Sequence, residues 1–143
     1  MNKIRPIGLS ILCVLLVISK GITPLWLSFV LIQSSQMSQL LGIGIGAFAV
    51  NALISLGIIL TAFFTWEGSV RAKKYLFMFV WANVLGVAFN NISILIDPSA
   101  LGIESLNQKQ LMQLVSNLVR SAFWIVLLYW YFNTAKAKEY FSA

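Results

Sequence analysis

The chain has 143 residues, of which 59% are hydrophobic and only 10% are charged. Soluble domains are about half apolar and about a quarter charged, so this composition excludes a soluble, disordered or fibrous protein. The chain has no His and one Cys, Cys13. This excludes zinc sites built on His and Cys clusters, His-based triads and internal disulfides. The mean hydropathy of +0.88 predicts an integral membrane protein.

Four apolar stretches have the length of membrane spans. An α-helix rises about 1.5 Å per residue, so roughly 20 apolar residues cross a bilayer core about 30 Å thick. None of the four alternates with a period of two, so a β-barrel is not expected. We expect an all-α fold, an integral membrane four-helix bundle, with residues 1–143 forming one transmembrane domain. The expected spans are about 6–26, 41–66, 75–96 and 111–132.

The end of the first span is open to two interpretations. The apolar run continues to Ile32, which is roughly 40 Å of straight helix and longer than the bilayer core. Lys20 and Gly21 interrupt this run, and Pro24 follows. Residues 22–32 either complete the span or lie along the outer surface. We expect a kink or break between Ser19 and Pro24.

The distribution of Lys and Arg predicts the orientation of the chain. With four spans, the amino end, the loop after the second span and the carboxyl tail share one side of the membrane. The opposite side has only Lys109. Both termini are therefore expected to be cytoplasmic. The residues on that side are Lys3, Arg5, Arg71, Lys73, Lys74, Lys136 and Lys138.

Three segments resemble a family of small four-span bacterial inner-membrane proteins, domain of unknown function 2569. The first reads Pro6-Ile-Gly-Leu, with Ile18-Ser19 and Pro24 further on. The second runs from Phe63-Phe64 to Arg71-Ala-Lys-Lys-Tyr75, and the third is Leu128-Tyr-Trp-Tyr-Phe-Asn-Thr-Ala-Lys-Ala-Lys-Glu-Tyr-Phe141. The resemblance implies the four-span fold and a multi-pass location in the bacterial inner (cytoplasmic) membrane. It brings no activity with it.

Polar residues inside the apolar stretches are the candidate site, because burying them in lipid is costly. Counted from the outer end of each span at about 1.5 Å per residue, six of them lie roughly 9–15 Å deep and form a candidate layer for an anion or a lipid head group. These residues are Lys20, Asn51, Asn90, Asn91, Asn117 and Arg120.

The candidate layer holds two cations and no carboxylate. An anion is therefore expected, either a lipid phosphate, a small anionic ligand, a partner's carboxylate, or Asp97 and Glu104 from the outer loop. The structural alternative is snorkelling together with interhelical hydrogen bonds worth about 1 kcal/mol each.

Spacing along the helices predicts which faces turn inward. Asn83 and Asn90 are seven residues apart and share one helical face. Lys20 and Arg120 are expected to face the bundle interior or an outward-open cavity rather than lipid, with Asn90 and Asn117 near them, and Arg120 belongs to a second polar face. Its members are Gln113, Asn117, Arg120 and Trp124. Gly42 and Gly46 form a candidate helix-packing pair, either between two copies of the chain or within one.

Catalysis is not expected, because no acid lies inside a span and there is no His to serve as a base. We expect no catalytic, cofactor-binding or metal-binding residues and no cofactor. The excess of Lys and Arg over Asp and Glu indicates membrane topology and contact with anionic lipid rather than nucleic-acid binding. The expected function is a non-enzymatic accessory, interaction or lipid-binding protein. Its expected partners are membrane phospholipid and either a second copy or a membrane protein. The alternatives are a small oligomeric solute carrier or channel and an immunity protein against a membrane-targeting toxin.

Overall fold

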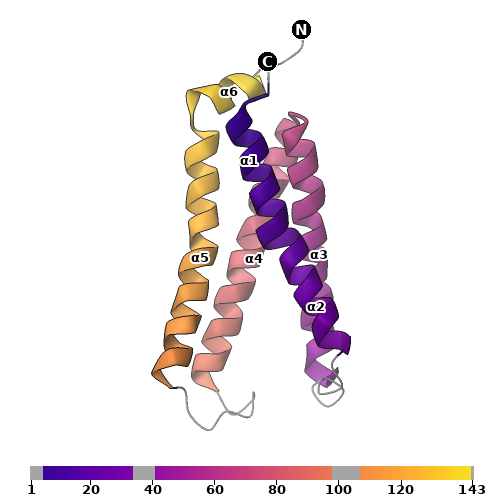
Figure 1. Ribbon diagram of the computed structural model, residues 1–143, viewed down its shortest axis with the longest axis vertical. Helices are drawn as coiled ribbons and strands as arrows, with labels where there is room; N and C mark the ends of the chain where they lie inside the picture. The colour runs from indigo at the N-terminus through magenta and orange to yellow at the C-terminus, as the bar shows by residue number, and fades with distance from the viewer. Residues whose placement is uncertain (1–4, 34–40, 98–106, 143) are drawn as a thin grey trace.

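The computed structural model describes residues 5–33, 41–97 and 107–142, and every long element in these ranges is a helix (Figure 1). The first helix is continuous and has three parts: α1 (Ile7–Leu16), a π-helical segment η1 (Val17–Ile22) and α2 (Thr23–Gln33). The remaining elements are α3 (Leu41–Trp66), α4 (Val70–Ile96), α5 (Gln108–Phe132) and α6 (Ala135–Ser142).

Four helical stretches are long and apolar enough to cross a membrane, which is consistent with a multi-pass membrane protein. They are Ile7–Trp26, Ala49–Trp66, Val70–Ile96 and Gln108–Phe132. The four helices run up and down side by side, and the short α6 lies across the end that carries both described termini (Figure 1). We call this end the terminal end of the bundle.

The irregularity expected between Ser19 and Pro24 is present, but it is a π-helical segment that begins at Val17, and the helix does not break. Proline has no backbone N–H, so the turn before Pro24 loses a donor. The Ile18 carbonyl oxygen accepts both the Thr23 backbone N–H and the Thr23 hydroxyl, the latter at 2.7 Å, and these bonds hold the turn together. Residues 22–33 therefore continue the first helix along the bundle, where α2 packs on α3.

Two helices begin earlier than the apolar stretches predict, because capping residues set the start of each helix. The Ser69 hydroxyl accepts the backbone N–H of Ala72 at 3.2 Å, so α4 begins at Val70 rather than near residue 75. Asn107 and Gln110 form a reciprocal capping box with two bonds of 2.9 Å, so α5 begins at Gln108.

The apolar core fills the terminal end of the bundle. It joins α1, α3, α4 and α5, and α6 closes it from above with Tyr140 and Phe141. The Tyr140 hydroxyl donates to the Trp66 carbonyl oxygen at 3.1 Å, which attaches α6 to the end of α3. The core residues are Leu9, Leu12, Cys13, Leu16, Ile58, Ala62, Leu76, Val80, Leu128, Phe132, Ala137, Tyr140 and Phe141.

Candidate functional site

Four buried polar residues lie at the middle of the bundle, one on each long helix. Lys20 is the central residue of the helix Ile7–Gln33, and Asn83 is the central residue of α4. Ser55 and Ser121 lie close to the centres of α3 and α5. Because the helices run side by side, these residues occupy one level. We call Lys20, Ser55, Asn83 and Ser121 the central polar layer.

Lys20 is 8% exposed and points into the bundle. Its Nζ donates a hydrogen bond of 3.0 Å to Ser121 Oγ, which links η1 to α5. The next residue, Gly21, lies against α3, and a Cβ there would meet the Ile59 side chain at 2.5 Å. The small residue lets η1 approach α3 closely, so that Lys20 is held inside. Lys20 therefore faces the interior of the bundle.

Several oxygens near this level have no hydrogen-bond partner among the described residues. They include Ser55 Oγ and Asn83 Oδ1 of the layer itself and Ser19 Oγ beside Lys20. An unsatisfied buried polar group costs about 1–3 kcal/mol. The centre of the bundle therefore has more hydrogen-bonding capacity than the described side chains use.

Arg120 differs from Lys20 because its side chain is exposed, although it is the central residue of α5. The inward side of α5 is instead formed by Leu114, Leu118 and Ser121, which are half-buried or buried. Of the face expected to turn inward, Gln113, Asn117 and Arg120 are exposed and Trp124 is half-buried, and Arg120 lies near enough to Lys20 for the two charges to interact. The exposed polar stripe of α5 consists of Gln113, Ser116, Asn117 and Arg120.

The polar layer expected from the sequence does not assemble as one group. Asn91 is buried and its Nδ2 donates to the Leu114 carbonyl oxygen at 2.8 Å, whereas Asn90 is exposed. The inward face of α4 includes Val84, and Asn91 follows it by seven residues, so Asn83 and Asn90 do not share a buried face. Asn51 is half-buried.

The depth of the site also differs from expectation. Lys20 was placed in the outer half because the first span was taken to end near Trp26. The helix continues to Gln33, so Lys20 lies about 20 Å of helix from either end. The sequence does not single out Ser55 and Ser121 as site residues, because small hydroxyl residues are common in membrane helices. Their central positions are the signal that identifies them.

The remaining sequence-based candidates are Gly42, Gly46 and Glu104, and the structure does not describe their surroundings. Gly42 and Gly46 belong to the first turns of α3. Glu104 lies outside the described residues. Close approaches occur at Gly8, where a Cβ would meet the Tyr131 ring, at Gly21, and at Gly57, where a Cβ would clash with the Phe79 ring.

Comparisons of the chain with protein-family models, with curated proteins and with solved structures found no match. The resemblance to domain of unknown function 2569 stays a prediction.

Proposed function

We propose that this chain is a non-enzymatic interaction protein of the bacterial inner membrane, with both termini in the cytoplasm. Its partner is a membrane protein that carries an acidic side chain at mid-membrane depth. The observation that carries the proposal is Arg120, a cation at the centre of α5 whose side chain is exposed.

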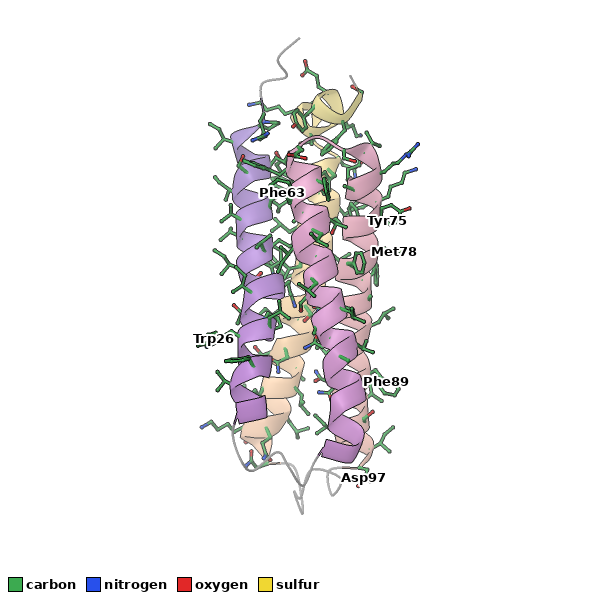
Figure 2. All side chains as sticks on the ribbon, turned by 90° about the vertical axis from the view of Figure 1, so that its right-hand side faces the viewer. Trp26, Phe63, Tyr75, Met78, Phe89 and Asp97 are labelled. Atoms are coloured by element: carbon green, nitrogen blue, oxygen red, sulfur yellow. The ribbon has the colours of Figure 1, made fainter. Side chains whose placement is uncertain are left out.

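The depth of the two cations favours a partner's carboxylate over a lipid phosphate or Asp97. A phospholipid phosphate lies at the membrane surface, about 15 Å from the middle of a bilayer core about 30 Å thick. Asp97 follows the last residue of α4 and lies at the end of the bundle opposite the termini (Figure 2). Neither reaches the level of Lys20 and Arg120 without a large distortion. A carboxylate on a partner's membrane helix reaches this level directly.

The outer surface of α5 has the properties of a contact face. None of the described residues forms a hydrogen bond or an ion pair with Arg120, and an Arg at the centre of a span costs about 2.5–3.5 kcal/mol on insertion scales. Gln113 and Asn117, on the same stripe, add amides that a partner helix would satisfy. The helix α5 packs mainly along α4.

A second copy of the chain is a poorer partner for this charge. The acids among the described residues are Glu67, Asp97 and Glu139, and all three lie beyond the ends of the long helices. Two Arg120 side chains facing one another would repel. The partner is therefore a different protein.

Association with a defined helix tests this proposal. The protein and a host transmembrane peptide of Leu and Ala with one central Glu are placed in liposomes, and energy transfer between labels reports binding. A twin peptide with Gln in place of Glu is the reference. We expect the Glu peptide to associate about tenfold more strongly, which corresponds to about 1.4 kcal/mol.

Arg120→Leu is expected to remove this preference. Lys109→Leu, which removes the same charge near the start of α5, is the matched control and is expected to keep it. Equal association of the two peptides with the unaltered protein contradicts the proposal, as does a preference that survives Arg120→Leu.

An oligomeric anion carrier is the second candidate. Lys20 and Arg120 favour this candidate because they lie at one level of the bundle. Two cations at one depth attract a permeating anion. Chloride uptake into liposomes separates the two proposals. Uptake that Lys20→Met abolishes favours the carrier, and its absence favours the interaction protein.

A further inference from the structure

An apolar groove runs along the outer surface between the first helix and α3. Its volume is about 280 Å³. Buried Cys13 and Ala62 lie at its base, and exposed Val14, Ile18 and Phe63 lie at its edges. Figure 2 shows Phe63 between α1 and α3 near the terminal end. The other lining residues are Val17, Ile59 and Trp66.

A cation stands at the terminal end of the groove. The Arg5 guanidinium lies over the Trp66 ring, 3.8 Å from its centroid, and Trp66 is itself a lining residue. The Trp66 indole N–H donates to Ser10 Oγ at 2.9 Å, which fixes the ring across the space between the two helices. Arg5 is exposed, so its N–H donors remain accessible beside the groove.

The size of the groove indicates which kind of molecule can occupy it. A helix with its side chains is about 10 Å across and rises about 5.4 Å per turn, so less than one turn would fill the available volume. A hydrocarbon chain is much thinner. On α3 the groove extends from Ile59 to Trp66, a rise of about 10 Å, which suits the upper part of an acyl chain.

The order of groups along the groove matches that of a phospholipid. Trp66 is the last residue of α3 and lies at the interfacial end of the span, where a phosphate lies in a bilayer. A phosphate there accepts hydrogen bonds from the Arg5 guanidinium, and the acyl chain follows the apolar lining toward Ile59 and Ile18.

We infer that this groove is a binding site for an anionic phospholipid, with its phosphate on Arg5 and one acyl chain between α1 and α3. The site uses none of the residues at the centre of α5. It is therefore independent of the association proposed for Arg120.

Native mass spectrometry of the full chain from nanodiscs tests the site. The nanodiscs contain equal amounts of phosphatidylglycerol and phosphatidylcholine, and the retained lipids are counted. We expect the protein to retain phosphatidylglycerol in excess of phosphatidylcholine. Arg5→Gln is expected to lower retained phosphatidylglycerol about fivefold. Lys74→Gln is the control, because Lys74 is an exposed residue of α4 and the groove is lined by the first helix and α3.

A second variant tests the groove itself. Val14→Trp places a large ring at an edge where the native side chain is 56% exposed, so the fold accepts it, and it is expected to lower retention of both lipids. Val126→Trp, at a similarly exposed position of α5, is the control. The site is refuted if the unaltered protein does not enrich phosphatidylglycerol. It is equally refuted if either groove variant matches its control.

Discussion

Lys20 and Arg120 are two cations at one depth in different surroundings. Lys20 is buried and donates to Ser121 Oγ, whereas Arg120 is exposed one residue before that serine. A buried cation is stabilised by the groups that accept its hydrogen bonds, and an exposed one in lipid requires a partner. The neighbouring residues Arg120 and Ser121 therefore differ in their surroundings, one exposed and one buried.

The bond between Lys20 and Ser121 gives the first prediction. Ser121→Ala removes the acceptor of a buried cation and is expected to lower the free energy of unfolding by about 1–3 kcal/mol. Lys20→Met removes the charge while keeping the length of the side chain, so stability is expected to stay unchanged or rise. Reversible unfolding in detergent mixtures, followed by circular dichroism, measures both.

The double variant isolates the interaction between the two side chains. Once Lys20 is Met, Ser121→Ala is expected to cost at least about 0.5 kcal/mol less than in the unaltered chain. The same loss in both backgrounds would show that the serine acts through packing alone.

The elements divide into those that the sequence locates well and those that it does not. Residues 41–66 match α3 because a polar segment and Glu67 bound an uninterrupted apolar run. The starts of α4 and α5 and the whole of α6 depend on caps and on packing of Tyr140 and Phe141, which hydropathy does not register. The π-segment was expected as an interruption, and its form depends on Gly21 and Thr23.

The candidate site was predictable only in part. The sequence identifies Lys20 as an interior cation, because a span with one charge turns it toward the protein. It does not distinguish Asn90 from Asn91, because a difference of one residue rotates the side chain by about 100° and only packing fixes the inward face. For the same reason the sequence does not predict that Gln113, Asn117 and Arg120 are exposed on α5.

The π-segment leads to a prediction for the first helix. Gly21→Ala places a methyl group against the Ile59 side chain, which is expected to destabilise the fold by about 1–3 kcal/mol and to loosen η1 from α3. Gly86→Ala is the matched control, since a Cβ there meets nothing within 4 Å. Equal melting temperatures for the two variants would mean that the close approach at Gly21 contributes nothing to stability.

At the scale of the whole molecule, the central polar layer divides the bundle. The continuous apolar core lies between this layer and α6, on the side of the termini. Beyond the layer, α5 is attached to α4 along its inward side, including the bond from Asn91 to the Leu114 carbonyl. The compact half anchors the fold, and in the more open half Gln113, Asn117 and Arg120 are exposed.

The location of both ends on one side of the bundle gives a topology prediction. Alkaline phosphatase fused after Ala143 is expected to be inactive in cells, because the positive residues at this end keep it in the cytoplasm. A fluorescent protein fused at the same position is expected to fluoresce. Strong phosphatase activity there would reverse the proposed orientation.

Charge reversal at Arg120 tests the central claim most directly. The Arg120→Glu protein and the unaltered protein are each offered host transmembrane peptides with a central Glu or a central Lys, and energy transfer in liposomes measures association. We predict that the unaltered protein prefers the Glu peptide and that Arg120→Glu prefers the Lys peptide. An unchanged order of preference after the reversal would contradict the account, because the charge at the centre of α5 would then not select the partner.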